Sequence, residues 1–154
     1  MDTTRTELKN TPTHDNLRRG FLREAGNAHR YLYFARIAGI EGLPGPAKIL
    51  NDLAESCLCN AHGHLDLLKR FGDPFTDLPM GASEHNLLAA VTSTAEEADE
   101  FYPDLVKKAQ EDGCPDIAGW FATLTRTSRN HSERLDQALA EMHQGLATTK
   151  EKTA

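Results

Sequence analysis

The chain has few cysteines, and this scarcity excludes a disulfide-stapled fold. Its 154 residues contain three, Cys57, Cys59 and Cys114, whereas small disulfide scaffolds are dense in cysteine. Cys57 and Cys59 are two positions apart, so on a helix their side chains point to different faces and cannot bridge. We therefore expect free thiols and a cytoplasmic location.

Positive charge and long apolar runs are scarce as well. The net charge is -6 and no basic patch stands out, so we expect no nucleic-acid partner. No apolar run approaches the roughly 20 residues that a membrane span needs, and the start, MDTTRTELKNTPT, shows no secretory signal. With 39% hydrophobic and 26% charged residues, the composition is typical of a soluble, single-domain globular protein that does not bind a membrane.

Proline and glycine divide the chain into four long segments, none of which alternates with period two as a strand does. The segments predict four helices, at about residues 12–40, 46–72, 84–112 and 115–144. Ser83 is expected to cap the third helix at its N-terminus. Pro103 is expected to kink that helix, because proline removes one backbone hydrogen bond.

Apolar residues recur in each segment at alternating spacings of three and four, the pattern of a helix with one face in a core. Short connections after the first and third helices predict antiparallel hairpins, and a connection of about a dozen residues joins the second helix to the third. The sequence therefore predicts an all-α, antiparallel four-helix bundle. We expect a polar N-terminal arm at residues 1–12, the bundle at residues 13–144 and a flexible tail at residues 145–154.

Polar side chains interrupt all four apolar stripes near mid-helix. In chain order they are Glu24; Cys57, Asn60 and His64; Thr94 and Glu97; and Ser128 and His131. A carboxylate in an apolar interior must be paired, protonated or bound to a cation, and two carboxylates at one level repel each other. One divalent metal would neutralise the buried carboxylates and remove their mutual repulsion, with Glu24, Cys57, Glu97 and His131 as ligands. This donor set suits iron, zinc or copper.

The same residues also allow a polar network without metal. Protonated His131 would pair with one glutamate, and the other glutamate would be protonated. Asn60, Thr94 and Ser128 would then donate hydrogen bonds to the carboxyl groups. Such networks are stable when every member is satisfied, so spacing alone leaves both interpretations open.

Three stretches of the sequence carry a family resemblance: REAGNAHRYLYFA, AHGHLDLLKRFGDPFTDLPMGASEHNL and EFYPDLVKKAQEDGCPDIAGWF. Over about residues 13–142 the chain resembles rubrerythrins of the ferritin-like superfamily. The resemblance implies a ferritin-like four-helix bundle, usually dimeric, with a di-iron carboxylate site that reduces peroxide. The CxxC pairs of the rubredoxin domain found in longer members are not seen in this sequence.

The family's iron ligands are only partly present. Its pattern is one glutamate on the first helix, Glu-x-x-His on the second, two glutamates on the third and Glu-x-x-His on the fourth. The matching positions here hold Glu24, Cys57, Asn60, Thr94, Glu97, Ser128 and His131, so three of the seven are kept. Two irons need bridging carboxylates and about four negative charges. We therefore expect a single metal, and neither a two-iron centre nor ordinary peroxidase chemistry.

The other cysteines and histidines are expected to lie outside the site. His64 is on the same face as Cys57 but two turns away, so it is expected to be a structural neighbour of the ligands. Cys59 is expected to be inert and Cys114 to be a surface thiol. Four further histidines are expected at the surface: His14, His29, His85 and His143.

Three functions follow from these features. The first is a rubrerythrin-like metalloprotein with one remodelled metal site, acting in redox or oxidative-stress chemistry with a small-molecule oxidant or an electron-donor protein. The second is a metal-free binding or scaffold module. The third is a thiol enzyme with Cys57 as its catalytic residue, activated by His131. We expect a homodimer and, if the protein is an enzyme, an oxidoreductase.

Overall fold

The protein is all-α over the part of the chain that the structure describes. The computed structural model gives the backbone of residues 9–153 and the side chains of residues 9–145. The elements are α2 (Pro12–Ile40), α3 (Pro44–Leu68), α4 (Ser83–Glu96), the π-helical turn η1 (Glu97–Phe101), α5 (Tyr102–Glu111) and α6 (Pro115–Thr153). None of these described helices is long and apolar enough to cross a membrane.

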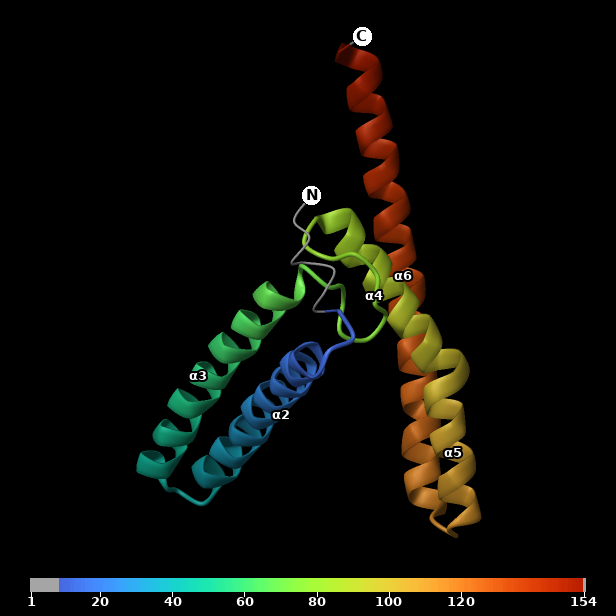
Figure 1. The fold of residues 1–154 in the computed structure, drawn as a ribbon. Helices are drawn as coiled ribbons and strands as arrows, with labels where there is room; N and C mark the ends of the chain where they lie inside the picture. Colours follow the sequence, from blue (N-terminus) through green and yellow to red (C-terminus); the bar gives the residue numbers. More distant parts are fainter. Residues whose placement is uncertain (1–8, 154) are drawn as a thin grey trace. The chain divides into compact units, whose positions relative to one another are not determined.

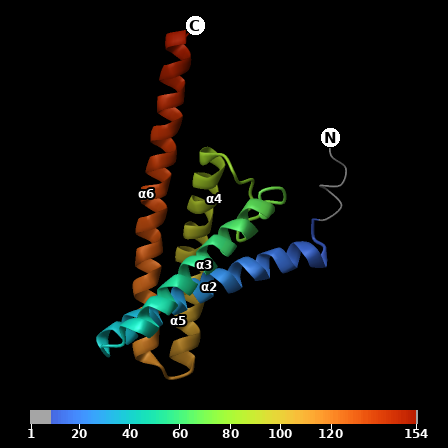
Figure 2. The same ribbon diagram turned by 90° about the vertical axis from the view of Figure 1, so that its left-hand side faces the viewer.

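The helices form two compact units, which divide between Pro74 and Phe75. In the first unit α2 and α3 run antiparallel, and in the second the run α4–η1–α5 returns alongside α6 (Figure 1). The view in Figure 2 shows the same pairing from the side. The predicted all-α class and the two antiparallel hairpins are confirmed.

Local chemistry sets the ends of α2 and the start of α3. The Thr11 hydroxyl accepts a hydrogen bond from the backbone N–H of His14 at 3.4 Å, and Gly42 ends the helix with a φ of 75°, which glycine adopts without strain. The helix α3 begins at Pro44, two residues before the predicted start at Pro46. Both prolines fit because the first-turn N–H groups have no partner within a helix.

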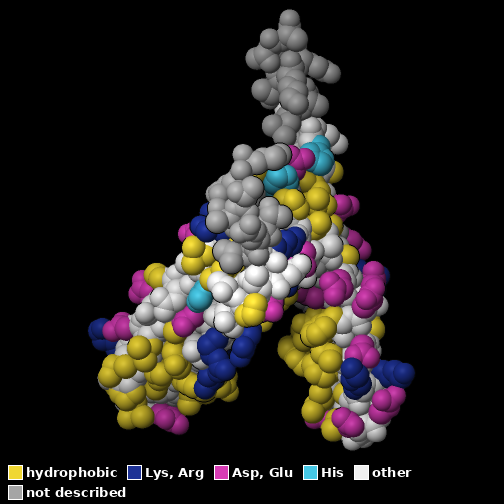
Figure 3. Space-filling view, viewed as in Figure 1, with side chains coloured by type: hydrophobic (Ala, Val, Ile, Leu, Met, Phe, Trp, Pro, Cys, Tyr) yellow, Lys and Arg dark blue, Asp and Glu magenta, His cyan; other side chains and the backbone are white. Residues whose placement is uncertain are grey.

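Alanine residues hold α2 and α3 together. Ala28, Ala35 and Ala38 on α2 and Ala54 and Ala61 on α3 are at most 7% exposed. Such small side chains let two helix backbones approach closely. Larger apolar residues elsewhere on the two helices stay exposed, among them Leu22, Leu32, Tyr33, Ile49 and Leu53. The seam therefore leaves each helix with apolar surface on its flanks, visible as yellow areas in Figure 3.

His14 is not a surface residue, contrary to expectation. Its side chain is 1% exposed, and its ring centroid is 4.7 Å from that of Phe71. The Nδ1 atom accepts the backbone N–H of Asn10 at 3.1 Å. His14 lies in the capped first turn of α2, where Phe71 just after α3 covers it. His29, His85 and His143 are exposed, as predicted.

The third predicted helix is one bent run made of α4, η1 and α5. Ala82 is its N-cap and Ser83 is already helical, so the prediction that Ser83 is the cap was wrong by one residue. The π turn lies just before Pro103, and the N–H of Tyr102 donates to the carbonyl of Glu97, five residues back. Proline cannot donate to the helix ladder, and a single wide turn accommodates this loss. The predicted kink is thus a π turn.

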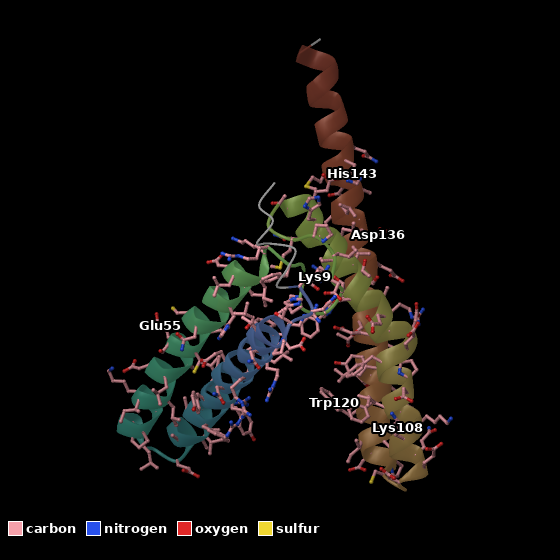
Figure 4. All side chains as sticks on the ribbon, in the orientation of Figure 1. Lys9, Glu55, Lys108, Trp120, Asp136 and His143 are labelled. Carbon is pink, nitrogen blue, oxygen red and sulfur yellow. The ribbon has the colours of Figure 1, made fainter. Side chains whose placement is uncertain are left out.

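A second alanine seam joins this bent run to α6. Ala89, Ala98, Ala109 and Ala118 are at most 7% exposed, and Ser128 is also buried. The helix α6 extends to Thr153, beyond the predicted end near Gln144. The sequence after Pro115 contains no further proline. Gly145, at the predicted end, costs only about 1 kcal/mol of helix stability, so the helix continues past it. His143, labelled in Figure 4, bonds through Nε2 to Glu84 at 2.7 Å.

Candidate functional site

Three polar residues of the α2–α3 hairpin meet around one carboxylate. The Asn60 side-chain amide donates to Glu24 Oε2 at 3.2 Å, and the Cys57 thiol also donates to the Glu24 carboxylate. Cys57 and Asn60 are three residues apart, so they share one face of α3. Glu24 and Cys57 are half-buried, whereas Asn60 is exposed. The structure thus brings together the polar residues that the sequence places near the middle of these two helices.

The surroundings of Cys57 keep its thiol protonated. Partial burial raises the pKa of Cys57, and the hydrogen bond to Glu24 and the negative charge of that carboxylate raise it further. A thiol is nucleophilic only as thiolate. This direction is opposite to the expected activation by His131, and it weighs against Cys57 as a free nucleophile.

His64 lies one turn beyond Asn60 and packs over Gly20, which is one turn before Glu24. A Cβ atom at Gly20 would lie 2.5 Å from His64 Cε1 and 2.8 Å from Nε2, so the ring needs a glycine there. The buried Nδ1 of His64 has no hydrogen-bond partner within the described residues. His64 is therefore fixed in the layer next to Glu24.

The C-terminal hairpin holds the second carboxylate in the π turn. Glu97 is the first residue of η1, and the Ser128 hydroxyl on α6 donates to Glu97 Oε2 at 2.9 Å. Ser128 is 4% exposed, and Glu97 is half-buried. Thr94, expected beside them, donates instead to the carbonyl of Ala90 at 2.8 Å. Its hydroxyl is used by its own helix.

His131 lies apart from this hydrogen bond. Its side chain is exposed and lines an open groove of about 360 Å³ on α6 with Thr127, Arg126 and Arg134. Within the described part of the hairpin, no hydrogen bond joins His131 to Glu97 or Ser128. A histidine three residues from Ser128 is about 60° away around the helix, which explains why one is buried and the other is not.

The four expected metal ligands are divided between the two hairpins. Glu24 and Cys57 lie in the first, and Glu97 and His131 lie in the second. Among the residues whose side chains are described, no three His, Cys, Asp or Glu groups gather as a ready metal site. Neither Glu24 nor Glu97 forms an ion pair with a Lys or Arg of that part of the chain. Each hairpin thus carries one carboxylate that is hydrogen-bonded but not charge-paired.

The sequence has relatives among known proteins. A family model described as Rubrerythrin matches residues 85–154. Rubrerythrin-1 of Clostridium acetobutylicum is 24% identical over 152 residues, which span 94% of this chain and 78% of the relative. The rubrerythrin of Porphyromonas gingivalis is 27% identical over 142 residues, which span 90% and 71% respectively. This chain is a rubrerythrin-like protein. A putative rubrerythrin of Methanocaldococcus jannaschii is 25% identical over 150 residues.

The rubrerythrin-like character confirms the resemblance and the ferritin-like fold class predicted from the sequence. The family model covers Glu97, Ser128 and His131. The similarity to the two bacterial rubrerythrins extends over both hairpins of this chain. Sequence analysis missed the burial of His14 and the π turn at Glu97. A signal for each was present: Thr11-Pro12 precedes His14 in the first turn, and Pro103 follows Glu97 by six residues.

Proposed function

We propose that this rubrerythrin-like protein is a metal-binding redox protein that holds one divalent transition metal through Glu24, Cys57, Glu97 and His131. One observation carries the proposal: Glu24 and Glu97 are half-buried carboxylates with neutral hydrogen-bond donors and no cationic partner among the described residues. A ferritin-like bundle has a single core, and one divalent cation there would neutralise both carboxylates. Iron, zinc and copper all accept this donor set.

The residues around the ligands have distinct tasks in this proposal. Asn60 and Ser128 fix the orientation of the two carboxylates by donating to one oxygen of each, as supporting hydrogen bonds do around metal sites. The thiol of Cys57 lies beside the Glu24 carboxylate, and it would have to lose its proton to solvent to serve as a ligand, because thiol ligands bind metals as thiolates. When bound, a redox-active metal supplies one-electron chemistry toward a small oxidant.

The replaced positions favour one metal over two. Two irons require several bridging carboxylates, but Asn60 and Ser128 stand at two of the family's ligand positions and donate hydrogen bonds to the remaining carboxylates. An amide N–H or a hydroxyl gives a carboxylate oxygen a hydrogen bond, but it adds no negative charge with which to hold a second metal ion. For this reason we do not propose for this chain the two-iron peroxidase chemistry that the family resemblance implies.

Metal analysis of the purified full-length protein tests the proposal. After anaerobic reconstitution with iron, zinc or copper and removal of loose ions, we expect about one tightly bound ion per chain. Glu24→Gln and Glu97→Gln should each weaken binding by about 10–100-fold. The matched controls Glu55→Gln and Glu96→Gln remove the same charge at exposed positions and should bind as the wild type does. Absence of binding after all three reconstitutions would refute a metal site, and two ions per chain would refute the single-metal site.

A metal-free scaffold is the second candidate, and one observation favours it. Asn60 and Ser128 already satisfy one oxygen of each carboxylate, so a polar network can form without a metal. Under this alternative Glu24→Gln and Glu97→Gln change stability but no metal-dependent property. The raised pKa of Cys57 places the thiol enzyme behind both. We further propose a homodimer in the cytoplasm, where the free thiols Cys57, Cys59 and Cys114 would stay reduced.

A further inference from the structure

The outer side of α2 carries a stripe of arginines. Arg19, Arg23 and Arg30 line an open groove of about 350 Å³ together with Leu22, Gly26 and Asn27. The spacings of four and seven residues place the three arginines on one face of α2, on the side away from the alanine seam. All three are exposed, and Figure 3 shows dark-blue side chains gathered over α2. We call this surface the arginine groove.

The charges of the arginine groove are not neutralised by carboxylates of the described residues. Lys48, Lys108 and Arg129 each contact a carboxylate, at distances of 2.6, 2.5 and 3.0 Å. No described residue forms an ion pair with Arg19, Arg23 or Arg30. Arg30 instead donates to the side-chain Oδ1 of Asn27 at 3.1 Å. The whole chain has a net charge of -6. A concentrated positive stripe on an acidic protein is an electrostatic feature that attracts negative groups.

The floor of the arginine groove is a glycine that the hairpin itself does not need. Gly26 lies in the middle of α2, where glycine lowers helix stability relative to alanine. A Cβ atom built there would meet nothing within 4 Å, so no close packing in this chain explains it. Gly20 shows the contrast, because a Cβ there would collide with His64. A glycine between exposed arginines leaves room for another molecule to approach the helix backbone closely.

We propose that the arginine groove docks a protein partner that presents a cluster of carboxylates. Arg19 and Arg30 are 11 positions apart, or about 16 Å along the helix, so the three guanidinium groups match an acidic surface better than a single small anion. Arginine binds carboxylates with two parallel hydrogen bonds. Exposed Leu22 and Phe34 on α2 add the apolar contacts of an interface. The acidic remainder of the chain disfavours nucleic acid. This inference is independent of the metal site.

Binding of a fluorescein-labelled oligo-glutamate peptide to the full chain tests this surface, with oligo-lysine as the opposite-charge control. We expect saturable binding at low salt that weakens as salt rises. Arg23→Gln/Arg30→Gln should weaken it by about tenfold. The matched pair Lys48→Gln/Lys69→Gln removes the same charge from the same hairpin, at residues already paired with Asp52 and Asp66, and should bind within about twofold of the wild type.

Gly26→Gln separates shape from charge. Gln is a good helix former, so the melting temperature should rise by about 2–4 °C, yet its side chain fills the groove floor and should weaken peptide binding severalfold. Three results would overturn the proposal: no binding by the wild type, equal losses in the two charge-matched pairs, or unchanged binding by Gly26→Gln. Tighter binding of phosphatidylserine vesicles or duplex DNA than of the acidic peptide would likewise overturn it in favour of another class of partner.

Discussion

The Glu24 carboxylate accepts from two side chains and affects them differently. For Asn60 the contact at 3.2 Å satisfies an amide hydrogen. For Cys57 the same carboxylate makes loss of the proton harder and raises the pKa of the thiol. The chemistry of Cys57 therefore depends on one neighbour contributed by another helix.

Replacing Glu24 by Gln should make Cys57 more reactive. The change removes the negative charge that raises the pKa of the thiol, so the thiolate fraction at a given pH increases. In a Cys59→Ser/Cys114→Ser background, iodoacetamide labelling should be faster than in the parent, and its rise with pH should be displaced to lower pH. Glu55→Gln, at an exposed position on α3, is the control. Identical pH profiles for Glu24→Gln and the parent would contradict the assigned contact.

Replacing Gly20 by Ala should destabilise the protein although alanine is the better helix former. The added carbon would lie 2.5 Å from His64 Cε1, and such overpacking costs about 1–3 kcal/mol. Gly26→Ala, where the added carbon meets nothing within 4 Å, should instead stabilise by about 1 kcal/mol. Urea unfolding measures both. Adding His64→Ala to Gly20→Ala should recover part of the loss, and stability of Gly20→Ala equal to the wild type would refute the contact.

At the scale of the helices, two features decide where polar groups lie. The π turn before Pro103 carries Glu97 at its first position, within 2.9 Å of the Ser128 hydroxyl. Single π turns often occur at functional sites. The alanine seams set how closely the helices approach, and therefore how near side chains on facing helices come to each other. A change in the seam should act on the whole hairpin.

Enlarging the seam tests its role. Ala61 on α3 is 4% exposed, and Ala61→Leu forces α2 and α3 apart, which should cost about 1–3 kcal/mol in the free energy of unfolding. Ala140→Leu makes the same substitution at an exposed position of α6 and should change the stability by less than about 0.5 kcal/mol. Thermal unfolding of both variants gives the comparison. Equal stabilities would show that close approach of the helices is not required.

At the scale of the molecule, each hairpin taken by itself leaves large apolar side chains uncovered. The alanine seams bury little apolar area, and larger residues such as Leu32, Phe101 and Ile117 remain exposed on their own hairpins. Helices of a ferritin-like protein surround one common core. The apolar flanks of both hairpins are therefore expected to be covered in the folded protein in solution.

The single tryptophan reports on that coverage. Trp120 projects from the side of the C-terminal hairpin, where it is 59% exposed (Figure 4). If the bundle covers this flank, native emission should be blue-shifted relative to the urea-unfolded chain and poorly quenched by acrylamide. Trp120→Glu should lower stability by about 3 kcal/mol or more, because it puts a charge into the covered face. Native emission equal to that of the unfolded chain would contradict a covered flank.

Much of the fold is predictable because it depends on local chemistry. The spacing of apolar residues and the capping signals at Thr11-Pro12 and Pro115 predict where the helices lie, and the short connections predict the hairpins. Three stretches of the sequence carry the resemblance to rubrerythrins. The proximity of Glu24 to Asn60 and of Glu97 to Ser128 also follows, since facing polar positions in antiparallel hairpins come together. Errors of one or two residues at Ser83 and Pro46 arise because several positions serve equally well as helix starts.

By itself, then, the sequence determined the all-α hairpins and which polar residues interrupt their apolar faces, because periodicity and capping act within a few residues of the chain. Only the tertiary structure decided that His14 is buried beneath Phe71, that Glu97 begins a π turn and that Cys57 is held as a thiol. It also decided that Arg19, Arg23 and Arg30 form no ion pair with any residue of the described part of the chain. Each of these properties depends on what lies across from a residue, and side chains from distant parts of the chain supply that environment.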